Sequence, residues 1–356
     1  MTRARWTSEK AQRWAQEQPW LVGCNFIPST ASNQFEMWQA DTFDAETIGR
    51  ELKWASEVRM NSVRVFLHDL VWQADAAGFK SRIETFLRLA DAVGIRTMFV
   101  LFDDCWFPPA AGPQPEPVKG VHNSRWAQSP GHGVTADREQ WPRLEAYVKD
   151  IVGTFGGDQR VCVWDLYNEP GNAILPLASL PPAKAIPLAL AKLTRHFVLP
   201  SPSIPLVRAS FEWARSVEPD QPLTVGIWAP NPRLNRLQLA QSDVISFHHY
   251  MSQKSLQKTI EKLKRRHQRP VFCTEWLARP MGSRVHTHLP VFQAEGVGCY
   301  CWGLVSGRTQ TIHSWSDCPG SPEPTLWHHD LLKQDGSAFD AQEIEVFKRC
   351  TSTSTY

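Results

Sequence analysis

The sequence of 356 residues contains no apolar run close to the ~20 residues that a helix needs to cross a bilayer. Its first ten residues are polar and carry no apolar core of a secretory signal, so we expect a cytoplasmic location. Strong charge is missing as well, because 38 Lys and Arg residues nearly balance 36 Asp and Glu residues. A net charge of +2 predicts no nucleic-acid partner and no membrane partner, and it favours a neutral ligand.

Motifs for nucleotides and metals are also lacking. No G-x-G-x-x-G follows the first apolar segment and no Walker sequence occurs, so a nucleotide cofactor is not indicated. The eight cysteines are scattered, and without a secretory signal they are expected to be reduced thiols. Cys299 and Cys301 share one face of a predicted strand, but no second pair stands at metal-ligand spacing. We expect neither a metal nor an organic cofactor.

Tryptophan is abundant, with sixteen residues against five tyrosines. Its flat apolar face and single polar edge suit both sugar rings and protein cores. Hydrophobic residues make up 42% of the chain, which is enough for a large core.

Short apolar runs alternate with longer amphipathic segments from residue 20 to about residue 350. Such continuous apolar runs are typical of parallel strands that are covered on both faces. Eight alternations predict a single (β/α)8 TIM barrel over residues 1–350, followed by a frayed tail at 351–356. The expected strands are Leu21–Phe26, Ser62–Phe66, Arg96–Phe102, Val161–Leu166, Leu223–Ile227, Val244–Phe247, Val271–Thr274 and Gly298–Trp302.

Three segments between the strands stand out. Residues 252–267 predict a helix with a solvated basic face. Residues 103–140 and 171–205 are rich in proline and follow strands three and four, so we expect long loops there. Loops at this end of a barrel carry the active site.

Two of the predicted strands end in a glutamate. Residues 161–170 read VCVWDLYNEP, in which a buried strand breaks into a polar pair that includes Glu169. Residues 270–276 read PVFCTEW and end another buried strand near Glu275. A carboxylate in such a place is costly unless it is paired or functional. Either glutamate alone could be a structural ion pair or a helix cap, but two on different strands favour glycoside hydrolysis, which needs two carboxyl groups.

At these positions the sequence resembles the retaining β-glycosidases of glycoside hydrolase family 5 and its clan. The resemblance extends from about residue 20 to residue 349. It rests on Asn168-Glu169-Pro170 after strand four, Glu275 on strand seven, Arg64 in strand two and Trp302 closing strand eight.

The resemblance implies a role for each position. Glu169 would be the acid/base and Glu275 the nucleophile, while Asn168 would bind the sugar 2-hydroxyl. Arg64 would keep Glu275 ionised through a charge-assisted hydrogen bond. Further positions that match the family are Tyr250, which would donate a hydrogen bond to Glu275, His248, which would line the site, and Trp302, which would stack on the sugar.

The chain departs from the family after strand three. Asp103 matches the family's Asp, but Cys105 occupies the usual histidine position, which puts the substrate contacts of typical endo-glucanases in doubt. Other residues could supply a different set of hydroxyl contacts, although loop packing is the favoured explanation for each of them taken singly. These candidates are Asp104, Trp106, His122, Asn123 and Trp126, with Asn25 and Trp38 near strand one and Trp276 after strand seven.

The sequence therefore predicts a retaining β-glycosidase that acts on oligosaccharides by double displacement. We expect the two carboxyl groups about 5–5.5 Å apart and a raised pKa for Glu169. Exo action on β-mannosides is the first choice, and exo action on β-glucosides or β-xylosides is the second. An endo-β-1,4-glycanase (glucanase, xylanase or mannanase) or a transglycosylase is the alternative. Two other classes are a noncatalytic carbohydrate-binding barrel and a metal-dependent hydrolase built on His248, His249, Asp103 and Asp104.

Overall fold

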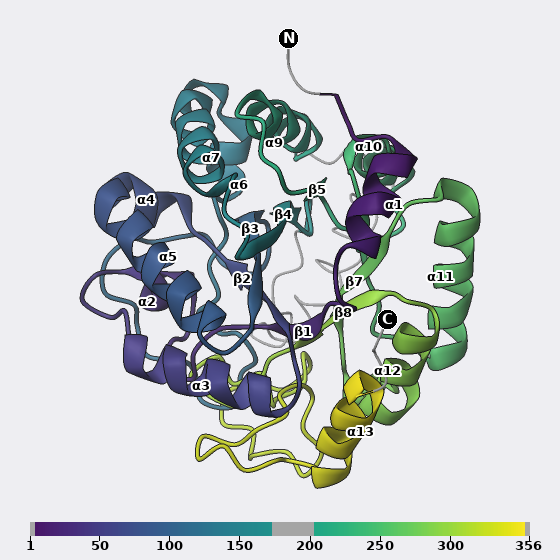
Figure 1. The fold of residues 1–356 in the computed structure, drawn as a ribbon. Helices are drawn as coiled ribbons and strands as arrows, with labels where there is room; N and C mark the ends of the chain where they lie inside the picture. The colour runs from purple at the N-terminus through teal and green to yellow at the C-terminus, as the bar shows by residue number, and fades with distance from the viewer. Residues whose placement is uncertain (1–3, 173–202, 353–356) are drawn as a thin grey trace, which may run out of the picture.

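The structure is a computed structural model that describes residues 4–172 and 203–352 (Figure 1). Most of the loop expected at 171–205, and the tail from residue 353, lie outside these residues. The helix at the end of the chain runs to Ser352, so the first two residues of the expected frayed tail are helical.

Eight parallel strands form the centre of the molecule, in the order β5-β4-β3-β2-β1-β8-β7-β6. An isolated parallel bridge between Ile227 and Phe247 joins the two ends of this sheet and closes the barrel. The predicted (β/α)8 fold is therefore confirmed. The strands are β1 (Val22–Asn25), β2 (Ser62–Phe66), β3 (Arg96–Asp103), β4 (Val161–Asn168), β5 (Leu223–Thr224), β6 (Ile245–His248), β7 (Val271–Trp276) and β8 (Gly298–Trp302).

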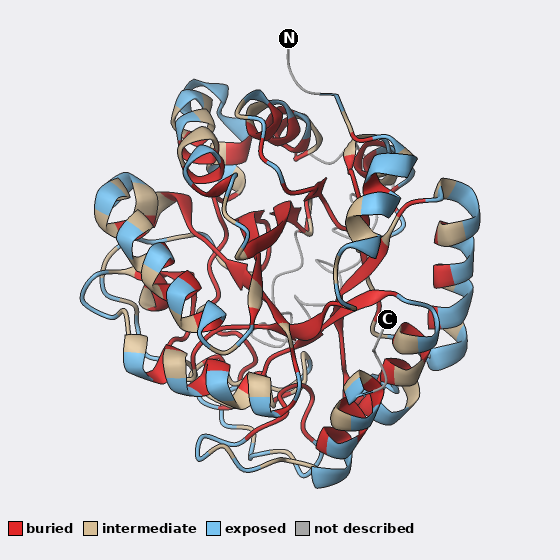
Figure 2. Ribbon diagram, in the orientation of Figure 1, coloured by how far each residue is buried: buried red, intermediate tan, exposed pale blue. Residues whose placement is uncertain are grey.

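Helices surround the barrel, and Figure 2 shows that they turn buried residues toward the strands and exposed residues outward. Among the helices that the structure describes, none is both long enough and apolar enough to cross a membrane. These helices are α1 (Ser8–Gln16), α2 (Gln34–Trp38), α3 (Ala45–Glu57), α4 (Asp69–Ala74), α5 (Ala76–Asp91), α6 (His132–Ala136), α7 (Trp141–Phe155), α9 (Ile204–Ser216), α10 (Pro232–Gln241), α11 (Gln253–His267), α12 (Val285–Ala294) and α13 (Ala341–Ser352), with 3-10 turns at Arg138–Gln140 and Arg279–Met281.

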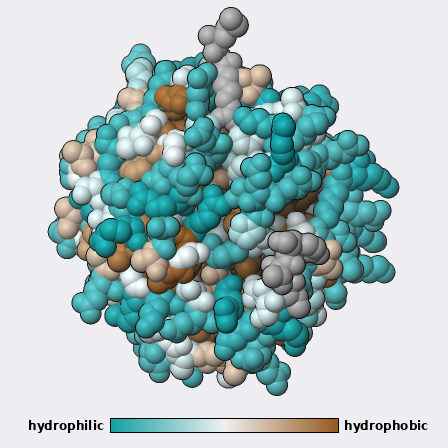
Figure 3. Space-filling view, in the orientation of Figure 1, coloured by the Kyte–Doolittle hydropathy of each residue, from teal (hydrophilic) through white to brown (hydrophobic). Residues whose placement is uncertain are grey.

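The basic helix α11 follows the predicted pattern. Leu256, Ile260 and Leu263 are buried against the barrel, while its charged side chains form a hydrophilic edge (Figure 3). The eight cysteines are free thiols, and only Cys318 is exposed.

The strand predictions differ from the structure mainly at their ends. β4 and β7 are longer than expected, so Asn168 and Glu275 belong to strands rather than to loops. β5 is shorter, because it pairs with β4 only at Leu223 and Thr224.

Gly23 on β1 is required by close packing, since a Cβ there would lie 1.7 Å from the carbonyl oxygen of Ser62 on β2. Parallel strands bring all their carboxyl ends to one mouth, where the candidate site lies.

Candidate active site

Glu169 and Glu275 lie at the barrel mouth, at the ends of β4 and β7. One carboxyl oxygen of each glutamate and a ring nitrogen of His248 lie within 4.8 Å of one another. Glu275 is 4% exposed, and Glu169 has a left-handed backbone with a φ of 43°. A non-glycine residue in this conformation stores strain of about 1–3 kcal/mol, which is common at functional sites.

Arg64 on β2 binds two carboxyl groups, that of Asp165 inside the barrel and that of Glu275 at its mouth. Its Nη1 lies 2.9 Å from Oε1 of Glu275, and its Nε and Nη2 bind Oδ2 of Asp165 at 3.0 and 2.8 Å. Nη1 and Nη2 also donate to the side-chain oxygens of Asn25 and Asn168, each at 2.7 Å. The predicted contact between Arg64 and Glu275 is therefore present.

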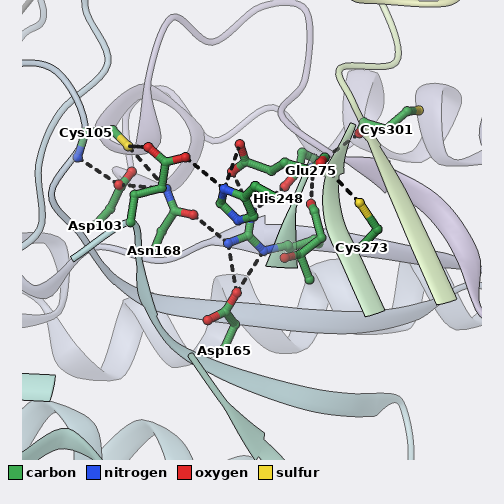
Figure 4. Close-up of polar contacts among 12 residues, drawn as sticks. Asp103, Cys105, Asp165, Asn168, His248, Cys273, Glu275 and Cys301 are labelled. Carbon is green, nitrogen blue, oxygen red and sulfur yellow. Dashed lines mark hydrogen bonds and ion pairs between the residues drawn. The ribbon is translucent and has the colours of Figure 1, made fainter. Parts of the chain in front are cut away.

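His248 stands between the two glutamates, as the close-up in Figure 4 shows for His248 and Glu275. Its Nδ1 lies 2.8 Å from Oε1 of Glu169 and 3.4 Å from Oε2 of Glu275. The hydroxyl of Tyr250 donates to Oε2 of Glu275 at 2.7 Å, as predicted. Each oxygen of Glu275 thus has its own donor, which favours the ionised form.

The pKa values of the two glutamates are the reverse of the expectation. Burial acts to raise the pKa of Glu169, but the hydrogen bond and charge of His248, with the hydrogen bonds of Asn172 and Cys105, outweigh it and lower that pKa. Burial raises the pKa of Glu275, and the charge of Glu169 adds to this effect despite His248 and Arg64. The prediction of a raised pKa for Glu169 is wrong for the free site because the sequence does not reveal how many donors surround this carboxylate.

A cavity of about 520 Å³ opens above the two glutamates. A volume of this order suits a small organic ligand. Its lining is aromatic and polar and consists of Phe66, Cys105, Trp106, His122, Asn123, Trp126, Asn168, Glu169, Asn172, Trp228, His248, His249, Tyr250, Met251, Glu275, Met281, Trp302 and Trp315.

One wall of this cavity is built from the loops that follow β3 and β8. Asn123 N donates to the carbonyl oxygen of Thr309 at 2.8 Å, and Nδ1 of His122 donates to that of His313 at 2.9 Å. Burial lowers the pKa of His122 to about 4. Its ring is therefore neutral at pH 7, and Nε2 is left as a hydrogen-bond acceptor.

Asp103 and Asp104, predicted to bind substrate, lie behind the cavity rather than in its lining. Asp103 accepts hydrogen bonds from Nδ2 of Asn168 at 2.9 Å and from Nε1 of Trp126 at 2.7 Å, and burial raises its pKa to about 7. Asp104 accepts from the Tyr167 hydroxyl at 2.7 Å. Both aspartates are fully engaged in holding neighbouring groups, so the prediction of direct contact is corrected.

Three further candidates do not reach the cavity. Asn25 points into the barrel below Arg64, and its amide donates to the carbonyl oxygen of Thr274 at 2.9 Å. Trp38 is 0% exposed and donates through Nε1 to the carbonyl oxygen of Phe66. Trp276 packs among outer-layer rings, because successive side chains of a strand point to opposite faces and its neighbour Glu275 points inward. Trp106 and Trp302 do line the cavity.

Sequence reasoning missed Asn172, whose Nδ2 lies 2.6 Å from Oε2 of Glu169. It also left Cys105 without a role, although its thiol lies 3.3 Å from the same oxygen. A signal for Asn172 was available, because Pro170-Gly171 is a turn pair that folds the chain back after Glu169.

A cation site is the alternative for a cluster of two carboxylates and a histidine. The guanidinium of Arg64 already lies against Glu275, and the charges of both glutamates, opposed by burial, raise the pKa of His248. Positive charge from these two groups opposes a divalent cation. The metal site expected from His248, His249, Asp103 and Asp104 is not assembled. Asp103 and Asp104 bind other partners, and Nε2 of His249 binds Ser255.

Three solved structures with a similar fold are glycoside hydrolases. A variant of GH5_18 from Streptomyces cattleya in complex with Manβ1-4GlcNAc is 13% identical, covers 95% of this chain and 82% of its own, and has a TM-score of 0.61. The β-mannanase from the blue mussel Mytilus edulis is 15% identical over 94% of this chain and 92% of its own, with a TM-score of 0.60. An exo-β-1,4-mannosidase from Opitutaceae bacterium strain TAV5 is 18% identical over 94% of this chain, which spans 60% of that protein, with a TM-score of 0.58.

No family model matches the sequence, and no match is found among curated proteins. At these identities the structural neighbours establish the fold, which is the (β/α)8 barrel of the family 5 glycosidases.

Proposed function

We propose that this chain is a retaining β-glycosidase in which Glu275 is the nucleophile and Glu169 the acid/base. The observation that carries the proposal is the pair of carboxyl oxygens within 4.8 Å at the ends of β4 and β7. Retaining glycosidases place these groups about 5–5.5 Å apart, whereas inverting enzymes leave about 6.5–9.5 Å for a water molecule.

The chemistry would proceed in two displacements. First, Glu275 attacks the anomeric carbon while Glu169 gives its proton to the glycosidic oxygen, so the glycosidic bond breaks and the alcohol leaves. Then Glu169 takes a proton from water, whose oxygen attacks the anomeric carbon and releases Glu275.

The contact between His248 and Glu169 provides a source for the proton that the first step needs. The Nδ1 proton of His248 faces Oε1 of Glu169 at 2.8 Å, so this pair can hold a dissociable proton beside the leaving group. When substrate displaces water around His248 and Glu169, the charged pair of imidazolium and carboxylate becomes less favourable than the neutral pair. The proton then resides on Glu169, and His248 becomes neutral.

Sugar recognition is assigned to Asn168 and Trp302. Nδ2 of Asn168 donates to Asp103 and, at 3.3 Å, to the sulfur of Cys105. Sulfur is a weak acceptor, so a sugar 2-hydroxyl can replace it. Trp302 lines the cavity, and its ring is stacked with those of His329 and Phe66.

Exo action is supported by the contacts between the loops after β3 and β8. Besides the bonds of His122 and Asn123, Arg308 binds Glu116 at 3.0 Å, so the two loops form a continuous wall on one side of the mouth. A wall there favours binding of a chain end over binding of a long polymer. β-Mannosides are the preferred substrates because the structural neighbours include an exo-β-1,4-mannosidase and a complex with Manβ1-4GlcNAc. A cytoplasmic enzyme would meet imported oligosaccharides of this kind.

The test is a panel of para-nitrophenyl β-glycosides with wild type, Glu169→Ala and Glu275→Ala. We expect turnover of the β-mannoside, loss of it in Glu275→Ala, and partial rescue of that variant by azide with formation of an α-glycosyl azide. NMR of the first product should show the β anomer, and an α anomer would contradict retention. Activity that is unchanged by a chelator argues against the metal-dependent alternative. Sugar binding without any turnover would favour the noncatalytic barrel.

An endo-acting enzyme or a transglycosylase would be recognised by its products. If the enzyme is exo-acting, the short sugar released from mannohexaose should have the same size throughout the time course. If it is endo-acting, released products of several sizes should appear together. Products longer than the substrate would indicate transglycosylation.

A further inference from the structure

The segment from Glu169 to Asn172 is a tight turn. Pro170 occupies its second position and Gly171 its third, with a φ of 80°, which is the geometry of a type II turn. Asn172 N donates to the carbonyl oxygen of Glu169 at 2.9 Å, and Gly171 N donates to Oδ2 of Asp104 at 2.6 Å. The turn is thus anchored to Asp104, the residue that follows β3, and it brings the side chain of Asn172 back to the carboxyl group of Glu169.

The two carboxyl oxygens of Glu169 have different donors. Oε1 faces Nδ1 of His248 at 2.8 Å. Oε2 faces Nδ2 of Asn172 at 2.6 Å and the sulfur of Cys105 at 3.3 Å. Of these groups, only the imidazolium of His248 has a proton that it can release near neutral pH.

The hydrogen of the Cys105 thiol is directed to Glu169. Amide nitrogens of Asn168 and Asn172 lie 3.3 and 3.6 Å from the sulfur, and an amide N–H can only donate, so the sulfur accepts from both. Two acceptors remain for the thiol hydrogen, Asp103 and Oε2 of Glu169 at 3.3 Å. Asp103 already accepts from Asn168, Trp126 and the backbone nitrogen of Cys105, so we assign the thiol hydrogen to Glu169. Burial and the charge of Asp103 raise the pKa of Cys105 well above its ordinary value, so the thiol keeps its hydrogen.

We propose that Asn172 and Cys105 are positioning residues for the acid/base, which hold Oε2 of Glu169 as a permanent acceptor and leave the catalytic proton to Oε1. They stabilise the carboxylate that forms when Glu169 gives up its proton. The inference rests on the proposed function, and it concerns the position where this chain departs from the family's usual histidine.

Charged groups of the neighbouring elements surround this contact. His248 on β6 acts on Glu169 directly, and Glu169 is coupled by charge to Glu275 on β7, which pairs with Arg64 on β2. Asp103 at the end of β3 acts on Cys105. Substitutions at Asn172 and Cys105 leave all of these in place, so a change in the titration of Glu169 reports on the two donors.

The experiment compares aryl β-mannosides with poor (phenyl) and good (2,4-dinitrophenyl) leaving groups, since only the former need the acid. Asn172→Ala removes the amide donor without adding a charge beside Glu169, and Cys105→Ala removes the thiol. Each should lower kcat/KM about tenfold or more for phenyl mannoside but less than about threefold for the dinitrophenyl substrate. The alkaline limb of kcat/KM should move up by about half a pH unit or more, because the acid form of Glu169 persists to higher pH. Cys105→Ser, which restores a donor, should return both readouts toward wild type.

The matched controls are Cys350→Ala on α13 and Asn235→Ala on α10, which should leave both readouts unchanged. Equal losses on the two substrates, with an unmoved alkaline limb, would overturn the inference.

Failure of the proposed function itself would appear differently, as a wild type that hydrolyses none of the glycosides. In that case the inference is tested by the free energy of unfolding. If the pKa of Glu169 is lowered in the folded state, Glu169 stabilises the protein at pH values above its unfolded pKa of about 4.3, and this stabilisation is lost as the pH falls. The gap in free energy of unfolding between wild type and Asn172→Ala should narrow below pH 4.5, and a constant gap would overturn the inference.

Discussion

Nη1 of Arg64 lies 2.9 Å from Oε1 of Glu275, and the side chains of both residues are buried. Arg64 also holds Asp165 at 2.8 Å, so one guanidinium compensates two buried carboxylates. A buried charge whose partner is removed is strongly destabilising.

Arg64→Met is therefore expected to lower the free energy of unfolding by about 3–5 kcal/mol at pH 7, measured by urea denaturation. The matched control is Arg265→Met, because Arg265 is exposed and pairs with an exposed Glu261. That change should stay within about 0.5 kcal/mol of wild type. A loss below about 1 kcal/mol in Arg64→Met would mean that solvent reaches Glu275 and Asp165 far more than their burial implies.

His248 should make stability depend on pH. Burial acts to lower its pKa, but the charges of Glu275 and Glu169 outweigh burial and raise the pKa above the ordinary value of about 6.5. A raised folded-state pKa contributes stability that is fully present below the unfolded value and is lost as pH rises through the folded value. The gap in free energy of unfolding between wild type and His248→Gln is thus expected to be largest below pH 6.5 and to shrink at alkaline pH. A gap that widens with pH would show that His248 is neutral in the folded protein.

The turn after β4 gives a test of backbone geometry. Gly171 has a φ of 80°, and Gly94 at the end of α5 has a φ of 74°. Alanine at either position should cost about 1–2 kcal/mol of stability, because L-residues are strained in this region. Only Gly171→Ala should also lower kcat/KM, by about 10- to 100-fold, since it displaces Asn172 and Glu169. Equal activity in the two variants would mean that the turn does not control the acid/base.

The barrel and the carboxylate pair could be predicted from the sequence because both depend on local patterns. Eight apolar runs are visible without any tertiary information, and Glu169 and Glu275 each end one of them. Arg64 and Tyr250 could be assigned to Glu275 through the family resemblance, and both contacts are present.

Burial and orientation could not be predicted in the same way. Trp38 ends α2 in the segment after β1 and Trp302 ends β8, yet the first packs in the core and the second lines the cavity. From the sequence, Asp103 is expected to bind substrate, because its hydrogen-bond partners Asn168 and Trp126 become visible only in the folded chain. The order of the two glutamate pKa values depends on donors such as Asn172, which only the folded chain brings together.

The two tryptophans also provide a direct test of this distinction. Trp38 is buried against Phe79 and Phe86, whereas Trp302 lines the cavity. Trp38→Leu should lower the free energy of unfolding by about 2–5 kcal/mol, as a cavity forms and the bond to Phe66 is lost, while KM stays unchanged. Trp302→Leu should raise KM for the β-mannoside about tenfold, because leucine lacks the flat face on which a sugar ring stacks. Steady-state kinetics and urea denaturation on the same two proteins separate the effects. An unchanged KM in Trp302→Leu would mean that the sugar does not bind against Trp302. A tenfold higher KM in Trp38→Leu would mean that Trp38 contributes to the site despite its burial.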